Sequence, residues 1–315
     1  MQVGRYVARR VWQLLPIMFG VTVVSFILIR IVPGDPATQI LGNHYTPAAA
    51  KAINHNLGLD RSIPAQYWLY LKSILSGNFG HSYFYNQSVG DLLSARLPPT
   101  LFLVVFAGLL TTAIAVPLGV LSGLHRGGLI DQGARVFFLV GYALPSFLLG
   151  VLLILALGVK LAIFPITGYG DGFVQHVQHL FLPAVTLAVP FSTVLVRSLR
   201  SQVIENTDSD YVTTARLKGV PWRDVVRRHV LPNSLLPLIV VFGVNLAFLV
   251  GGTVVIENVF SVPGVGSLLV SSVSTRDFPV VQALTLLFAA LVLLVNLITD
   301  VVHVTFDPRL AQRTM

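Results

Sequence analysis

Long apolar stretches without charged side chains alternate along this chain with short segments rich in arginine. A helix needs about 20 mostly apolar residues to cross a bilayer. Six stretches without Asp, Glu, Lys or Arg come close to that length or exceed it. They are residues 11–29, 97–124, 136–159, 172–196, 231–256 and 278–299. The pattern therefore predicts an all-α integral membrane protein with six transmembrane helices.

The first apolar stretch follows Arg9 and Arg10, as the apolar core of a secretory signal peptide follows basic residues. Such a core has only about 7–15 residues and ends at a cleavage site of the Ala-x-Ala kind. This stretch is longer, and no such site follows it. We expect it to remain in the protein as the first transmembrane helix.

The basic residues gather in segments that fall on one side of a six-helix arrangement. They are Arg5, Arg9, Arg10, Arg126, Arg135, Arg197, Arg200, Arg216, Lys218, Arg223, Arg227, Arg228, Arg309 and Arg313. Short basic segments are typical of the cytoplasmic side. We therefore predict that both termini are cytoplasmic.

Three parts follow from this topology. Residues 1–32 hold the N-terminus and the first helix. Residues 33–96 form an external segment whose aromatic residues and prolines predict a small folded cap. Residues 97–315 form the core with helices two to six, a cytoplasmic segment at 197–233 and a cytoplasmic C-terminus. The cap either docks a partner or gates the path, or it only stabilises the outer helix ends.

Proline and small residues are frequent in the apolar stretches, and we expect several kinked, closely packed helices. The prolines are Pro117, Pro145, Pro183, Pro190 and Pro237. Gly119-x-x-x-Gly123 and Ala247-x-x-x-Gly251 place small residues on one helix face, where another helix can approach closely.

Composition supports a membrane protein and narrows its chemistry. Of 315 residues, 54% are hydrophobic and 11% charged, whereas a soluble domain has about 25% charged residues. The net charge of +8 does not indicate nucleic acid binding, because the basic residues separate apolar stretches instead of forming a patch with aromatics. The chain has no cysteine, which excludes disulfides and thiolate chemistry.

Motifs for catalysis or ion coupling are missing from the sequence. There is no phosphate-binding Gly-Lys loop, no His-Glu-x-x-His and no Gly-x-Ser-x-Gly. His176-x-x-His179 has a spacing that suits a metal, but two interfacial histidines explain it better. No apolar stretch carries a row of carboxylates or arginines of the kind used in proton relays. We expect no enzyme activity, no cofactor and no metal, and an energy source in another chain.

The segment between the fourth and fifth apolar stretches predicts two short helices. Thr207 or Ser209 is placed to cap the first helix, and Gly219 to end it in a left-handed conformation. Pro221 suits the first turn of the second helix, which we expect to end near Pro232.

The first short helix lacks an apolar stripe broad enough to hold it in lipid. Tyr211, Ala215 and Gly219 fall on one face, which a groove of a partner protein could enclose. An amphipathic loop at the lipid headgroups is the alternative, and the residues alone do not decide between them.

Residues 213–232 resemble the cytoplasmic signature of permease subunits of bacterial ATP-binding-cassette importers. That signature is Glu-Ala-Ala, three residues, Gly, nine residues, then Ile-x-Leu-Pro. Here Thr213-Thr214-Ala215 take the place of the triplet, Gly219 is the glycine, and His229-Val230-Leu231-Pro232 end the motif. Two residues of the triplet and the Ile differ from the family pattern. Asp210-Tyr211-Val212 and Lys218-Gly219 are similar to the dipeptide and oligopeptide (peptide/nickel) branch.

The resemblance extends over nearly the whole chain, in an order that matches this branch and its first (B-type) permease. Its other motifs are Pro33-Gly34-Asp35-Pro36, Leu57-Gly58-Leu59-Asp60, Gly77-Asn78-Phe79-Gly80-x-Ser82, Arg96-Leu97-Pro98-x-Thr100, Ile256-Glu257-x-Val259-Phe260-Ser261-x-Pro263-Gly264-x-Gly266 and Asp307-Pro308-Arg309.

The resemblance implies the type I importer fold and a coupling helix that docks on an ATPase subunit. The residues it assigns to this contact are Asp210, Tyr211, Thr214, Ala215, Arg216, Lys218, Gly219 and Pro232. The implied partners are a second permease in a heterodimer, two ATPase subunits that use ATP and Mg, an extracytoplasmic binding protein and membrane lipid.

Dipeptides or short oligopeptides are the cargo that this branch implies. Nickel or its chelate, glutathione and an opine remain alternatives within the family. An ATP-independent channel or carrier, an exporter, and a membrane enzyme acting on lipid are alternatives outside it.

Overall fold

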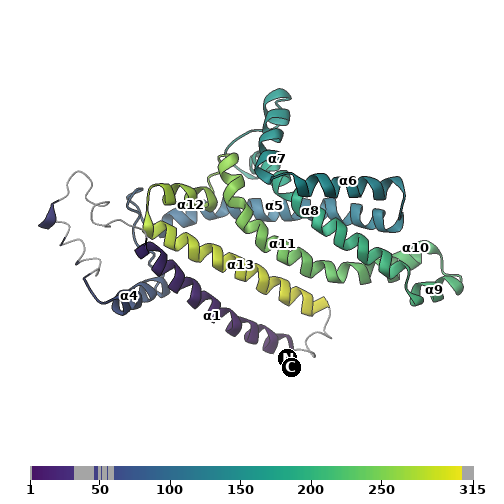
Figure 1. Cartoon of the computed structure of the whole chain (residues 1–315), viewed down its shortest axis with the longest axis horizontal. Helices are drawn as coiled ribbons and strands as arrows, with labels where there is room; N and C mark the ends of the chain where they lie inside the picture. Colours follow the sequence, from purple (N-terminus) through teal and green to yellow (C-terminus); the bar gives the residue numbers. More distant parts are fainter. Residues whose placement is uncertain (1, 32–45, 49–50, 52–54, 56–59, 307–315) are drawn as a thin grey trace. The chain divides into compact units, whose positions relative to one another are not determined.

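The computed structural model describes residues 2–31, 46–48, 51, 55 and 60–306, and all its regular elements there are helical (Figure 1). The only β-bridge in this part of the chain pairs His81 with Ser88. The helices are α1 (Gln2–Ile31), α4 (Ile63–Leu75), α5 (Val89–Leu124), α6 (Leu129–Ala143), α7 (Ser146–Leu153), η2 (Ile154–Lys160), α8 (Phe173–Thr207), α9 (Asp210–Leu217), α10 (Trp222–Val225), η3 (Val226–Val230), α11 (Leu231–Val259), α12 (Val265–Ser274) and α13 (Phe278–Phe306).

Five helical stretches of the described chain are long and apolar enough to cross a membrane, and a bent pair makes a sixth. The predicted all-helical membrane fold is therefore confirmed. The third predicted helix differs from expectation, because α6 and α7 meet at an angle of 102°. Leu144 is extended (ψ 122°) and Pro145 follows it. A residue before proline avoids the helical conformation, which explains a break where we expected a kink.

The remaining prolines are accommodated within continuous helices. Pro183 and Pro190 lie inside α8, and Pro237 lies inside α11. Helix α8 also continues beyond its apolar part to Thr207, so that the predicted cytoplasmic segment begins as an extension of the fourth transmembrane helix. Charged residues at the end of this helix do not interrupt it, because they lie beyond the apolar part.

Contacts divide the described chain into two compact units, which we treat separately. The larger unit draws on Met1–Val11, Pro99–Ser267 and Leu291–Met315, and the smaller on Trp12–Pro98 and Leu268–Ala290. Within the larger unit, α8 packs against α11, α6 and α7. The bidentate ion pair of Arg10 and Asp300 ties the start of α1 to the end of α13, with an Nε–Oδ2 distance of 2.8 Å.

Two glycines of α5 confirm the predicted close approach of helices. A Cβ at Gly119 would lie 2.9 Å from Cβ of Leu199, and one at Gly123 would lie 2.7 Å from Cβ of Val203. Both neighbours belong to α8, so α5 and α8 touch without room for a methyl group. At Gly251, by contrast, nothing in the described chain lies within 4 Å of the missing Cβ, so the close approach expected there stays a prediction.

The smaller unit contains the described part of the predicted external cap. Asp277 is buried and accepts hydrogen bonds from the Ser82 hydroxyl (2.5 Å) and from the backbone N–H groups of Tyr83 and Phe84. Tyr67 of α4 shares a hydrogen bond of 2.8 Å with Thr22 of α1. The segment following α4 is therefore held by specific polar contacts, as a folded cap requires.

Three of the sequence motifs fall on residues that the structure does not describe. They are Pro33-Gly34-Asp35-Pro36, most of Leu57-Gly58-Leu59-Asp60, and Asp307-Pro308-Arg309.

Candidate coupling site

Helix α9 begins at Asp210, where the sequence predicted a cap from a side-chain hydroxyl. Ser209 does take the N-cap position with an extended backbone (ψ 152°), but its hydroxyl donates to the carbonyl of Asn206. The Thr207 hydroxyl has no partner. Neither side chain caps the helix. Asp210 in the first turn supplies the negative charge that favours a helix N-terminus.

Gly219 ends α9 as the sequence predicted. Its φ of +77° lies in the left-handed region, which glycine adopts without strain. The backbone N–H of Val220 reaches the carbonyl of Ala215 at 3.2 Å, and that of Gly219 reaches Arg216 at 2.9 Å. Pro221 then takes the N-cap position of α10, one residue earlier than predicted.

The predicted end of the second helix at Pro232 is wrong. Helix α10 passes through η3 directly into α11, so residues from Trp222 to Val259 form one helical stretch. Pro232 lies in the first turn of α11. Just before it, the N–H of Leu231 bonds to Val226, five residues back. In a regular α-helix the ring of a proline collides with the carbonyl four residues earlier. The wider π winding before Pro232 relieves this collision, so the helix continues.

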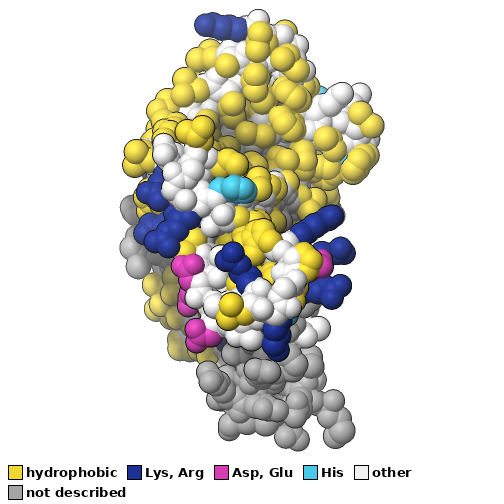
Figure 2. Space-filling view, turned by 90° about the vertical axis from the view of Figure 1, so that its right-hand side faces the viewer, with side chains coloured by type: hydrophobic (Ala, Val, Ile, Leu, Met, Phe, Trp, Pro, Cys, Tyr) yellow, Lys and Arg dark blue, Asp and Glu magenta, His cyan; other side chains and the backbone are white. Residues whose placement is uncertain are grey.

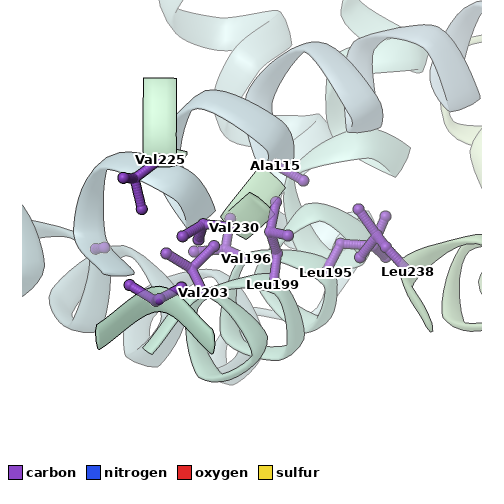
Figure 3. Close-up of a cluster of buried hydrophobic side chains, with 10 residues drawn as sticks. Ala115, Leu195, Val196, Leu199, Val203, Val225, Val230 and Leu238 are labelled. Atoms are coloured by element: carbon purple, nitrogen blue, oxygen red, sulfur yellow. The ribbon is translucent and has the colours of Figure 1, made fainter. Parts of the chain in front are cut away.

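The inner face of α9 is fixed to the body of the larger unit. Val212 is buried and belongs to a cluster with Val203 of α8, Val225 of α10 and Val230 of η3 (Figure 3). Ala215 is half-buried and packs against the same cluster. Ala215 is therefore partly covered by the cluster, whereas Tyr211 and Gly219, with which we expected it to share an open face, are exposed. A movement of α9 must therefore also move the C-terminal end of α8 and the N-terminal end of α11.

A polar network adds to this attachment. The Tyr211 hydroxyl donates to Oδ1 of Asn206 at 2.6 Å, and Nδ2 of Asn206 donates to the Ser234 hydroxyl at 3.1 Å. Asn233 donates to the carbonyl of His229 at 2.7 Å. The signature residue His229 is therefore linked to Asn233 in the first turn of α11.

The outer face of α9 is open and combines apolar and basic groups. Leu217 is 84% exposed, and the exposed rings of Tyr211 and Trp222 lie on either side of it in sequence. The Arg216 guanidinium lies 5.3 Å from the Trp222 ring, within range of a cation–π contact. Figure 2 views the end of the molecule that carries α9 and α10, where Lys and Arg side chains gather.

The structure leaves most of the predicted contact residues exposed on this segment. They are Asp210, Tyr211, Thr214, Arg216, Lys218, Gly219 and Pro232. Pro232 also lines an apolar cavity of about 600 Å³ with Leu235, Phe242 and other residues of the larger unit. Leu217 and Trp222 were missed from the sequence. The sequence feature that could have identified them is a large apolar residue next to charged ones in the predicted cytoplasmic segment.

The motif that begins at Ile256 contains a buried cap for helix α12. Glu257 is fully buried and accepts hydrogen bonds from the N–H groups of Gly266 and Ser267, at 2.8 and 2.9 Å. The Thr100 hydroxyl donates to it at 2.6 Å and accepts from the N–H of Val265. A carboxylate at a helix N-terminus satisfies free N–H groups and the helix dipole. This arrangement explains why the motif combines Glu257 with glycines that leave room for its carboxylate.

The two histidines suggested as metal ligands have other partners. A ring nitrogen of His176 lies 2.9 Å from the carbonyl of Tyr169, and one of His179 lies 2.7 Å from that of Thr167. The His176 ring also stacks on Tyr169, whose pKa is raised by burial. Within the described ranges, no three His, Cys, Asp or Glu residues lie where they could share a metal.

Comparison with family models identifies the kind of protein that carries this segment. Residues 115–312 match the family described as "Binding-protein-dependent transport system inner membrane component", and residues 3–104 match its N-terminal companion. The chain belongs to this family.

Relatives cover this permease from end to end. The probable peptide ABC transporter permease protein y4tP of Sinorhizobium fredii is 36% identical over 310 residues, 98% of this chain and 99% of its own length. The oligopeptide transport system permease protein AppB of Bacillus subtilis is also 36% identical, covering 97% and 98%. The glutathione transport system permease protein GsiC of Escherichia coli is 35% identical, covering 96% and 97%.

Solved structures show the same fold. The methionine transporter MetNI in an inward-facing conformation aligns over 69% of the permease and 96% of its own chain, with a TM-score of 0.56 at 20% identity. An amino acid ABC transporter aligns over 68% and 93%, with a TM-score of 0.54 at 15% identity. The predicted type I importer fold is thus confirmed.

Proposed function

We propose that this permease forms half of the transmembrane path of an ATP-driven importer of dipeptides or short oligopeptides. The observation that carries the proposal is the construction of α9. Its inner face is built into the cluster of Val203, Val225 and Val230, while Leu217 and its basic neighbours are open to a partner. This leucine between charged residues stays exposed among the residues that the structure describes, and a groove of an ATPase subunit would bury it.

The mechanism follows from this attachment. ATP binding closes two ATPase subunits, and their closure moves α9 together with the ends of α8 and α11. A second permease of similar fold forms the other half of the path, and an extracytoplasmic binding protein delivers the cargo. ATP and the loaded binding protein both act by binding one state of the path more tightly than the other. ATP hydrolysis with Mg then takes place in the partner chains, and this chain is not an enzyme.

Short peptides are the favoured cargo because the relatives y4tP and AppB are named for peptide or oligopeptide transport. Glutathione is the second candidate, because GsiC is nearly as similar and is named for it. Glutathione is itself a tripeptide, so one path can suit both. The cytoplasmic location of both termini follows from the basic segments and belongs to the same proposal.

Co-purification from mild detergent tests the proposal. The tagged permease should bring with it an ATPase and a second six-span subunit. The variant Leu217→Glu should lose the ATPase, because a charge replaces the apolar group that the groove would bury. Leu75→Glu is the matched control, since Leu75 is 80% exposed at the end of α4 and lies on the expected outer side.

Uptake of peptide into vesicles distinguishes an ATP-driven importer from a channel or carrier. ATP-dependent uptake of peptide that Leu217→Glu abolishes and Leu75→Glu preserves would support the importer. Uptake by the permease alone, without ATP, would show that it is a channel or carrier and refute the proposal.

A further inference from the structure

A fully buried carboxylate joins α6 to α8 near the proposed coupling segment, which consists of α9 and α10. Asp131 in the first turn of α6 has no exposed surface. Arg200 of α8 binds it with two nitrogens, Nε to Oδ1 at 2.5 Å and Nη2 to Oδ2 at 2.9 Å. Two parallel N–H···O bonds make this the most directional kind of ion pair. The link fixes both the distance and the orientation of the two helices.

Further donors complete the surroundings of Asp131. The backbone N–H of Gly127 donates to Oδ2 at 2.9 Å, and Nη2 of Arg135 donates to the same oxygen at 3.0 Å. The loop between α5 and α6 therefore meets α6 and α8 at one carboxylate. The other ion pair of this region, Arg126 with Asp208 at 3.6 Å, is about two-thirds exposed on both sides and contributes little.

Helix α6 also packs against α8 through apolar and aromatic side chains. Its buried residues are Asp131, Ala134 and Gly141. Gly141 touches α8, where its missing Cβ would lie 2.6 Å from Cγ2 of Thr193. These packing contacts are not directional, whereas the bidentate pair fixes both the distance and the angle between its two partners. Asp131 therefore provides the directional polar link between α8 and the broken third span, in addition to this packing.

Arg200 stands close to the coupling segment along α8. Seven residues separate it from the end of the helix at Thr207, a distance of about 10 Å at 1.5 Å per residue. Val203, one turn beyond Arg200, belongs to the cluster that holds α9. A displacement of α9 reaches Arg200 through rigid helix and reaches α6 through Asp131.

We propose that Asp131, held by Arg200, is a positioning residue that transmits the movement of the coupling segment to α6 and the third transmembrane span. This inference rests on the proposed function, because it requires an ATPase that moves α9. It goes beyond it by assigning the transmission to one side chain. Asp131 itself contacts neither nucleotide nor cargo.

The test uses the purified complex with its ATPase and reads the movement of α6 directly. Because the chain has no cysteine, an environment-sensitive fluorophore can be attached at Leu139→Cys on α6 or at Val240→Cys on α11. Both positions are exposed, at 68% and 38%. ATP with vanadate, which traps the closed ATPase, should change the emission at both positions.

In the Asp131→Asn background, the emission change at position 139 should fall by a factor of about 5 or more, a typical size for loss of coupling between sites. The change at position 240 should remain. Asp300→Asn is the matched control, because it breaks an ion pair of the same unit that involves neither α6 nor α8. It should leave both signals as they are. Where Asp131→Asn does not fold, Arg200→Lys keeps the charge but loses the bidentate geometry, and should weaken the signal at 139.

An unchanged signal at position 139 in a folded Asp131 or Arg200 variant would overturn the inference. So would a parent complex in which position 139 does not respond to ATP, or an equal loss in Asp300→Asn. Failure to recover any ATPase with the parent protein would instead refute the proposed function and the inference together.

Discussion

Replacement of Gly123 by alanine tests the contact between α5 and α8. The added Cβ would lie 2.7 Å from both Cβ and Cγ1 of Val203, and 3.2 Å from the carbonyl oxygen of Arg200. Carbon atoms in contact prefer about 3.5–4.0 Å, so the helices must separate by about 1 Å. Overpacking of this kind costs about 1–3 kcal/mol. Alanine returns about 0.5–1 kcal/mol through its better helix propensity.

The expected net effect is a loss of up to about 2.5 kcal/mol in the free energy of unfolding, the difference between these two terms. Thermal unfolding in detergent, followed by the temperature at which half of the protein remains monodisperse, measures it as a fall of a few degrees. Gly133→Ala on α6 is the matched control, because nothing lies within 4 Å of its missing Cβ. This variant should be neutral or slightly stabilised.

Equal unfolding temperatures for the two alanine variants would contradict the reasoning. They would mean that α5 and α8 are not packed at Gly123 as the structure has them.

Three further predictions concern the ends of helices. Gly219→Ala should reduce import more than Gly219→Asn, because nothing lies near the missing Cβ and asparagine tolerates a positive φ better than alanine; equal import by the two variants would show that docking, not backbone strain, limits this position. Thr100→Ala should destabilise the protein by about 1–3 kcal/mol by removing a donor from the buried Glu257, and Thr100→Ser should restore the unfolding temperature. A membrane-impermeant maleimide should label Leu75→Cys in intact cells and Leu217→Cys only after permeabilisation; the opposite pattern would invert the proposed topology.

The transmembrane helices were predictable because lipid enforces a simple rule. Every long stretch without charge became helical, since an unpaired backbone is too costly in hydrocarbon. The close packing at Gly119 and Gly123 was also visible, because two small residues on one helix face leave a groove. The same spacing at Ala247 and Gly251 has no such neighbour at Gly251 within the described residues, since the pattern shows that a helix can approach but not that one of this chain does.

The polar contacts could not be predicted, because they join residues far apart in the sequence. Asp131 and Arg200 are separated by 69 positions, and Thr100 and Glu257 by 157. Nothing near Asp131 in the chain shows that it will be buried. The exposure of Leu217 was missed for a similar reason: whether Ala215 or Leu217 is exposed depends on the cluster beneath the helix.

The π winding at Val226–Val230 gives the number of residues in this stretch a meaning of its own. Because α10 and α11 are one helical stretch, deleting a single residue there would turn α10 by about 100° and draw it about 1.5 Å closer to the span. Trp222 and the neighbouring α9 would then point away from any partner that fits them now. A substitution in this stretch changes one side chain. An insertion or deletion changes the direction in which α9 and Trp222, the proposed docking surface, face. The number of residues at this position therefore determines how α9 and α10 are oriented toward the proposed ATPase partner.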